Sequence, residues 1–263
     1  MIKFCSLFSG SSGNCIFIGT DNAKILIDAG VSGARIATAL QEIGENPQDL
    51  SAIFVTHEHS DHVASVGILS RRFNVPIYAT EKTWLAMGKG PGKILPENKK
   101  ILTHGQIVTI EDLEVKNFTV SHDAADPVAY TFGCGDKKVS VATDMGYVSD
   151  EVRENVMGSN LILLESNHDI GMLKAGPYPY PLKQRILSQH GHLSNVAAAD
   201  FLAELAMNGT DRIFLGHLSQ ENNTPECAYE TACEILLERD LKPGRDLDLW
   251  VADRKNYSEV VCL

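Results

Sequence analysis

The chain has 263 residues, and its 34 acidic side chains outnumber its 23 basic ones, which gives a formal net charge of −11. A hydrophobic fraction of 44% and a charged fraction of 22% are ordinary for a globular protein and exclude a largely disordered chain. No apolar run reaches the roughly 20 residues that cross a bilayer, and the first residues lack the features of a signal peptide, so we expect a cytoplasmic protein with no membrane partner.

Strand-length runs rich in β-branched residues recur along the chain, each bounded by Gly, Asp, Asn or Pro. We predict strands over Ile16–Ile18, Lys24–Ile27, Ala52–Thr56, Val75–Tyr78, Leu113–Val120, Ala129–Phe132, Lys138–Ala142, Asn160–Leu164, Arg212–Leu215 and Leu247–Val251. Helical spacing of apolar residues predicts helices over Val31–Ile43, Ser194–Met207 and Thr224–Glu238. Ser32 and Ser194 are candidate N-caps. This mixture predicts an α/β fold in which helices pack on sheet faces.

Two basic segments interrupt the acidic chain. Residues 71–100 carry seven basic side chains against two acidic ones, and residues 174–185 carry three basic side chains and no acid. The Gly- and Pro-rich stretches Gly88–Pro96 and Gly176–Pro181 fall within these segments and are predicted to be loops. The segments are either solvated faces or the rims of a substrate entrance, and composition leaves both open.

The string Thr56-His57-Glu58-His59-Ser60-Asp61-His62 directly follows the predicted strand at Ala52–Thr56. If the extended conformation continues by one step, His57 and His59 point the same way, because strand side chains alternate. Asp61 and His62 then lie where a helix can begin. Imidazole nitrogen and carboxylate oxygen suit zinc and similar divalent ions. The string therefore predicts ligands to one metal or to two neighbouring metals.

Further ligand-type side chains follow other predicted strands. His122, Asp144 and His217 each come directly after a strand-length apolar run. The carboxyl ends of strands in an α/β sheet are where ligand clefts form, so we expect these side chains to meet the His57–His62 string. His104 competes with His122 for this role, but it lies in a turn before a strand, and we favour His122.

Together these residues resemble the metallo-β-lactamase-fold superfamily, and the resemblance covers nearly the whole chain. Residues 8–14 and 25–30 match the opening segments of that superfamily. The resemblance implies one domain over residues 1–263, an αββα sandwich with a dinuclear site along one edge. It implies that His57, His59 and His122 hold a first divalent ion (Zn, Mn or Fe), that Asp61, His62 and His217 hold a second, and that Asp144 bridges them. Asp28 would support the ligand loop.

Three later motifs narrow the resemblance to the WalJ/YycJ (VicX)-like exonuclease family. They are Glu165–Asp169, Gly176–Pro179 and Gly191–Asn195. Resemblance to that family implies an exonuclease activity that degrades DNA from its 5′ ends. Gly191–Asn195 is also similar to the tRNA 3′-processing nucleases of this fold, although the chain has no obvious tRNA-binding arm. Only 72 residues separate Asp144 from His217, too few for the inserted β-CASP domain of related nucleases.

The hypothesis is a phosphodiesterase, most specifically a 5′ to 3′ DNA exonuclease, whose nucleophile is a metal-bridging hydroxide. We assign catalytic roles to Asp61, also a ligand, and to His192, the proton donor to the leaving group, oriented by an acidic neighbour such as Glu165. For His192 the alternative is a structural residue at a helix start. His168 either reaches the site or makes local hydrogen bonds. His190 is expected to be exposed.

Two other classes of protein compete with a nuclease. A metallohydrolase of a small molecule, such as a glyoxalase II-like thioesterase or a phosphodiester metabolite hydrolase, also fits the His57–His62 string. The helical substrate domain of glyoxalase II usually follows the last ligand, whereas 46 residues follow His217 here. A non-catalytic regulator is disfavoured because all seven candidate ligands are present. Nucleic acid, as DNA ends, is the expected partner.

Overall fold

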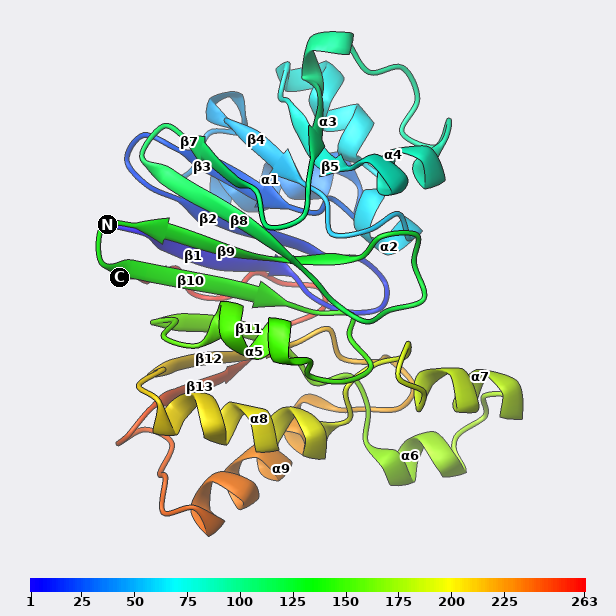
Figure 1. Ribbon diagram of the computed structural model, residues 1–263, viewed down its shortest axis with the longest axis vertical. Helices are drawn as coiled ribbons and strands as arrows, with labels where there is room; N and C mark the ends of the chain where they lie inside the picture. The colour runs from blue at the N-terminus through cyan, green and yellow to red at the C-terminus, as the bar shows by residue number, and fades with distance from the viewer.

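The computed structural model of the protein describes all 263 residues, and its elements form four layers, in the order helices, sheet, sheet, helices (Figure 1). The first sheet has the strand order β14-β1-β2-β3-β4-β5-β6 and the second has β13-β12-β11-β10-β9-β8-β7. The first sheet contains β1 (Lys3–Phe8), β2 (Cys15–Gly19), β3 (Lys24–Ile27), β4 (Ala52–Phe54), β5 (Ile77–Thr80), β6 (Lys99–Leu102) and β14 (Val261–Cys262). The second contains β7 (Ile107–Ile110), β8 (Leu113–Thr119), β9 (Val128–Cys134), β10 (Lys137–Ala142), β11 (Leu161–Glu165), β12 (Arg212–Gly216) and β13 (Asp248–Val251).

Nine α-helices cover the outer faces of the sheets or project from one edge. They are α1 (Gly33–Glu42), α2 (Ser60–Val63), α3 (Val66–Phe73), α4 (Glu81–Met87), α5 (Asp150–Val156), α6 (Ile170–Ala175), α7 (Tyr180–Ile186), α8 (Asn195–Met207) and α9 (Pro225–Glu238). Short 3₁₀ turns span Pro47–Asp49 and Pro96–Asn98. None of the helices combines the length and the apolar character that crossing a bilayer requires.

Each pair of neighbouring layers shares a hydrophobic cluster. Between the two sheets, Phe54 stacks on Tyr78 and meets Tyr130 edge-on. On the outer face of the first sheet, side chains of α1 and α3 such as Leu40 and Leu69 pack over the strands. Burial of large apolar side chains is the main stabilising contribution in such a sandwich, at about 1.5–3 kcal/mol for each one fully buried.

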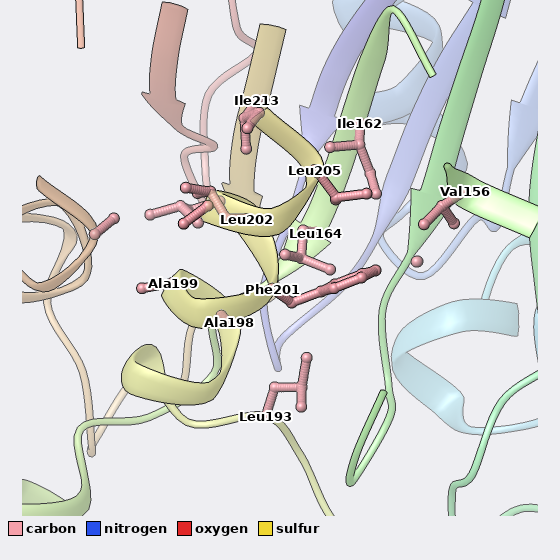
Figure 2. Close-up of a cluster of buried hydrophobic side chains, with 14 of the residues drawn as sticks. Val156, Ile162, Leu164, Leu193, Ala198, Ala199, Phe201, Leu202, Leu205 and Ile213 are labelled. Atoms are coloured by element: carbon pink, nitrogen blue, oxygen red, sulfur yellow. The ribbon is translucent and has the colours of Figure 1, made fainter. Parts of the chain in front are cut away.

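The cluster under α8 also reaches the edge of the sheet where ligand-type residues gather. Figure 2 shows Phe201, Leu202 and Leu205 of α8 against Ile162 and Leu164 of β11. Leu193, which precedes the helix, is buried in the same cluster. Ser194 caps α8 by accepting a hydrogen bond from the backbone of Ala197. Packing and capping together hold the segment before α8, and with it His192, in one place.

The predicted fold class is confirmed: the molecule is an αββα sandwich of the metallo-β-lactamase type without a β-CASP insertion. All ten predicted strands and all three predicted helices are present, with ends displaced by a few residues. Ser32 caps α1 as expected. The prediction missed β1, β6, β7 and β14 and the four short helices α4, α5, α6 and α7. In β6, Lys99, Lys100 and Ile101 are exposed, so this edge strand lacks the apolar pattern on which the prediction relied.

Two local predictions were wrong in detail. The helix expected after the His57–His62 string is two helices, α2 and α3, because the backbone of Ser65 turns away to donate a hydrogen bond to the carbonyl of Ala29. The loop predicted over Gly176–Pro181 ends earlier, since α7 starts at Tyr180. Pro181 is tolerated there because the first turn of a helix needs no amide donor at that position.

Candidate metal centre

The seven candidate ligands come from segments that are far apart in the sequence and meet at one edge of the sandwich. His57 and His59 follow β4, and Asp61 and His62 lie in α2. The other three, His122, Asp144 and His217, follow β8, β10 and β12. The pairs β10–β11 and β11–β12 are parallel, so the residues after β10 and β12 emerge at the same edge. This is the placement expected of a cleft in an α/β sheet.

The first group of side chains contains His57, His59 and His122. Their ligand atoms all lie within 4.8 Å of one another. His57 Nε2 and His59 Nδ1 are 3.0 Å apart, and the rings of His57 and His122 have centroids 5.1 Å apart. Three imidazoles that converge in this way can bind one divalent ion.

The second group contains Asp61, His62 and His217, and Asp144 lies between the two groups. The ligand atoms of the second group also lie within 4.8 Å of one another. Asp144 Oδ2 is 3.5 Å from His62 Nε2, and Asp144 Oδ1 is 3.4 Å from His217 Nε2 and 3.7 Å from His122 Nε2. Asp144 is therefore in position to bridge two ions.

The ring nitrogens that face away from the centre are held by protein groups. His62 Nδ1 is 2.7 Å from Asp28 Oδ2, and His57 Nδ1 is 3.0 Å from Thr56 Oγ1. Asp28 also accepts hydrogen bonds from the backbone and the hydroxyl of Thr56. The outer nitrogen of His122 faces the carbonyl of Gly191. Such contacts fix the tautomer and the direction of each ring, and Asp28 does so for the ligand loop as the resemblance implied.

Three residues of the site adopt left-handed backbone conformations. The φ angles are +61° at Asp28, +59° at Asp144 and +55° at His217. Aspartate is among the non-glycine residues that adopt the left-handed conformation more often than most. The conformation still costs energy, so the surrounding contacts must hold it. The hydrogen bond from the backbone of His217 to Ser9 Oγ helps to hold one of them. These turns aim side chains at the centre directly from the strand ends.

The residues present fit a pair of divalent cations. Asp144 Oδ2 and His217 Nε2 are buried at the centre without a hydrogen-bond partner, as is expected of atoms that bind a metal ion. Burial raises the pKa of Asp144, but the imidazoles of His217 and His62 lower it by more, so the carboxyl stays ionised. Burial lowers the pKa of His217, yet Asp144 and its neighbours raise it to about 10. The centre therefore favours added positive charge.

His192 stands beside this centre with an acidic partner. Its Nδ1 is 2.7 Å from Glu165 Oε1 and 3.8 Å from Asp144 Oδ1. Glu165 Oε1 is also 3.0 Å from His217 Nδ1, so one buried carboxylate orients both rings. Burial lowers the pKa of His192, but the carboxylate of Glu165 outweighs it and raises that pKa above its ordinary value. This arrangement suits a proton donor.

Comparison with known proteins agrees with this geometry. The family model described as the metallo-beta-lactamase superfamily matches residues 9–217. The chain belongs to this superfamily. It is 42% identical over 259 residues to the exodeoxyribonuclease YycJ of Bacillus anthracis, covering 98% of both chains. It is 44% identical over 250 residues to the exodeoxyribonuclease WalJ of Streptococcus pneumoniae, covering 94% of this chain and 93% of the relative.

The fold of this superfamily member also resembles solved structures. The metallo-beta-lactamase fold protein YhfI of Bacillus subtilis superposes with a TM-score of 0.70 and covers 98% of this chain, and this chain covers all of YhfI. Only 16% of the aligned residues are identical. At that identity the likeness supports the fold alone.

The remaining histidines lie outside the two ligand groups. His104 is exposed and bound to Asp126, so His122 and not His104 is at the centre. His190 is exposed, as expected. His168 is buried, and neither of its ring nitrogens has a hydrogen-bond partner. Burial lowers the pKa of His168 to about 4, so the ring is neutral.

Sequence reasoning missed Asp123. Its Oδ1 is buried without a hydrogen-bond partner and lies 3.3 Å from His122 Nε2, while its Oδ2 pairs with Arg185 Nε of α7. The only signal in the sequence was its position next to His122. In the sequence, Arg185 stands out only as part of the basic segment 174–185.

Gly30 packs against the backbone of the ligand loop, residues 57–62, and leaves no room for a side chain there. A Cβ atom at Gly30 would lie 1.6 Å from the carbonyl oxygen of Asp61, which already accepts a hydrogen bond from the backbone of Asn14. We expect Gly30→Ala to lower the free energy of unfolding by about 1–3 kcal/mol, the usual cost of overpacking, and to weaken metal binding. Urea denaturation and metal titration measure the two effects.

Gly133→Ala is the matched control for Gly30→Ala. Gly133 lies in β9, and the nearest neighbour of an added Cβ is 4.0 Å away. The Gly133→Ala protein is expected to bind metal with the same affinity as the parent. Parental stability and metal affinity in Gly30→Ala would show that the ligand loop does not depend on this contact.

Proposed function

We propose that the protein is a dinuclear-metal-dependent phosphodiesterase and, more specifically, a DNA exonuclease that acts 5′ to 3′. The observation that carries the proposal is the His192–Glu165 pair beside Asp144, because a proton donor next to two candidate metal positions suits cleavage of a phosphodiester. The identity of 42–44% to relatives named exodeoxyribonucleases supports DNA as the substrate. We place this activity in one domain, residues 1–263, acting on DNA ends in the cytoplasm.

In this proposal each ligand-type residue has a role. The first ion would be held by His57, His59 and His122, the second by Asp61, His62 and His217, and Asp144 would contact both. When bound, two such ions supply an activated water as nucleophile and neutralise charge on the phosphoryl oxygens. Zinc, manganese and iron all accept imidazole and carboxylate ligands.

Two of the protein's own residues, His192 and Glu165, serve to protonate the leaving group. Glu165 accepts the hydrogen bond from His192 Nδ1 and so holds the imidazole in one orientation. His192 gives its proton to the departing oxygen, which would otherwise leave as an unfavourable alkoxide. Leu193 is buried under α8 and anchors the backbone that carries His192. This keeps the imidazole of His192 beside the metal centre.

Basic side chains near the same edge provide local attraction for DNA despite the net charge of −11. In Figure 1, α4 with the loop that follows it and the α6–α7 pair project on the side where α2 lies. Lys89 and Lys93 of that loop are exposed. Arg71 is not free for DNA, since it donates hydrogen bonds to the carbonyls of Pro91 and Lys93 and braces the loop. We therefore expect the protein to contact few DNA phosphates, so that its affinity for DNA depends only modestly on salt concentration.

A substrate panel tests the proposed function. The purified protein, supplied with Mn²⁺ or Zn²⁺, is offered end-labelled linear duplex DNA, closed circular DNA, RNA and lactoylglutathione. We expect degradation of linear duplex DNA from its 5′ ends and no attack on the closed circle. Turnover of the thioester without degradation of any nucleic acid would instead identify a small-molecule hydrolase.

A further inference from the structure

A small cavity opens beside His192, between the metal centre and the α6–α7 pair. Its volume is about 180 Å³, and the residues lining it include Ser11, Asp123, Tyr178, Arg185 and His192. This volume is below the roughly 300–1,000 Å³ typical of sites for drug-sized molecules. The cavity thus suits one small group, such as the sugar and phosphate of a single nucleotide.

Arg185 is held at this cavity through one of its nitrogens. Its Nε pairs with Asp123 Oδ2, and this is the guanidinium's one hydrogen bond within the chain. Asp123 in turn is tied to the centre, since its other oxygen lies 3.3 Å from His122 Nε2. A guanidinium has five N–H donors, so four remain for a ligand. An arginine held through Nε presents its terminal amino groups as a fork that matches two phosphate oxygens.

Lys183, the other basic residue of α7, is not available in the same way. Lys183 Nζ donates hydrogen bonds to the carbonyls of Lys174 and Gly176, so it braces the α6–α7 connection. Tyr178 and Leu182 line the cavity next to Arg185 and offer apolar surface to a sugar or a base. Apart from His192, whose proton goes to the leaving oxygen in the proposed function, Arg185 is the basic side chain that lines the cavity.

We propose that this cavity is the subsite for the terminal nucleotide of the substrate, and that Arg185, positioned by Asp123, binds the 5′-phosphate of that nucleotide. The inference rests on the proposed nuclease function. His192 lines the cavity, so a fragment that takes its proton from His192 sits there when the bond breaks. An ordinary 5′ end carries a phosphate, whereas a 3′ end carries a hydroxyl. An arginine in the cavity therefore selects 5′ ends and accounts for the polarity of degradation.

The test compares two duplexes of one sequence, with 5′-phosphate or 5′-hydroxyl ends. A charge-assisted hydrogen bond is expected to give the parent a preference for the phosphorylated end of about 10- to 100-fold in kcat/KM. Arg185→Gln is expected to bring this ratio close to one, and Arg185→Lys, which keeps the charge without the fork, to an intermediate value. A purely structural role would lower both rates equally and leave the ratio unchanged.

Arg239→Gln is the matched control, because Arg239, directly after α9, forms an exposed pair with Asp200 of α8 and does not line the cavity. It is expected to keep the parental ratio. A measurement that needs no variant is inhibition of the parent, where thymidine 5′-monophosphate should compete at least tenfold better than thymidine.

The outcomes separate this inference from the proposed function. A parent that degrades both duplexes equally well, or an Arg185→Gln protein that keeps the preference, would overturn the role of Arg185 alone. A parent that fails to hydrolyse bis(p-nitrophenyl) phosphate with Mn²⁺ would overturn the phosphodiesterase itself, since that substrate has no terminal phosphate.

Discussion

Asp144→Asn is expected to remove nearly all activity and to leave fewer than two metal ions per chain. Asp144 is the residue that lies within reach of both ligand groups, at 3.7 Å from His122 Nε2 and 3.5 Å from His62 Nε2. An amide keeps the shape but loses the negative charge on which a bridging ligand depends. Loss of a residue that merely supports a ligand typically lowers metal affinity or activity by 10–100-fold. For a ligand itself we expect kcat/KM to fall by more than about 100-fold.

Elemental analysis and hydrolysis of linear duplex DNA measure the two effects of Asp144→Asn. Asp136→Asn is the control, because Asp136 lies in the turn at the opposite end of β10 and its side chain is 87% exposed. It is expected to bind metal and cleave DNA like the parent. Two bound metals and a parental rate in Asp144→Asn would refute the bridging role.

His192→Ala is expected to lower kcat on DNA by about 10²- to 10⁴-fold while both metal ions remain bound. The alanine protein cannot protonate the leaving oxygen, yet none of the seven candidate metal ligands is changed. A substrate whose leaving group is p-nitrophenolate needs no proton, so its hydrolysis should fall much less. This difference between substrates separates a proton donor from a residue that only shapes the segment before α8.

The control for His192→Ala is His190→Ala, two residues earlier in the same segment. His190 is exposed, its ring forms a hydrogen bond with Ser121, and it is not among the candidate metal ligands. It is expected to keep the parental rate on DNA. Equal losses on DNA and on the p-nitrophenyl substrate in His192→Ala would argue for a structural role and against proton donation.

Local patterns in the sequence predicted the elements that are strongly buried or clearly capped. Strands such as β11 are buried at every position and apolar up to their last residue, and α8 combines a Ser194 cap with a long apolar pattern. The prediction failed where neighbours outside the element decide its structure. The edge strand β6 carries two exposed lysines, and the break between α2 and α3 depends on the carbonyl of Ala29, more than 30 residues away.

The kind of chemistry at the site could be predicted from the sequence alone. His57, His59, Asp61 and His62 fall within six residues, and a strand followed by a short helix is enough to bring them to one place. His122, Asp144 and His217 could be predicted because each ends a strand, and strand ends meet at the edge of a sheet. These inferences need only local geometry and the general architecture of the fold.

The groups that tune that chemistry are brought together by tertiary packing and could not be predicted from local patterns. Glu165 joins His192 and His217, which are 27 and 52 residues away, and Asp123 meets Arg185 across 62 residues. No periodicity links such positions, because their contact depends on how α6, α7 and the segment before α8 pack against the sheet edge. The basic segment 174–185 was visible as charge, but packing decided that Lys183 braces a loop while Arg185 faces the cavity beside His192.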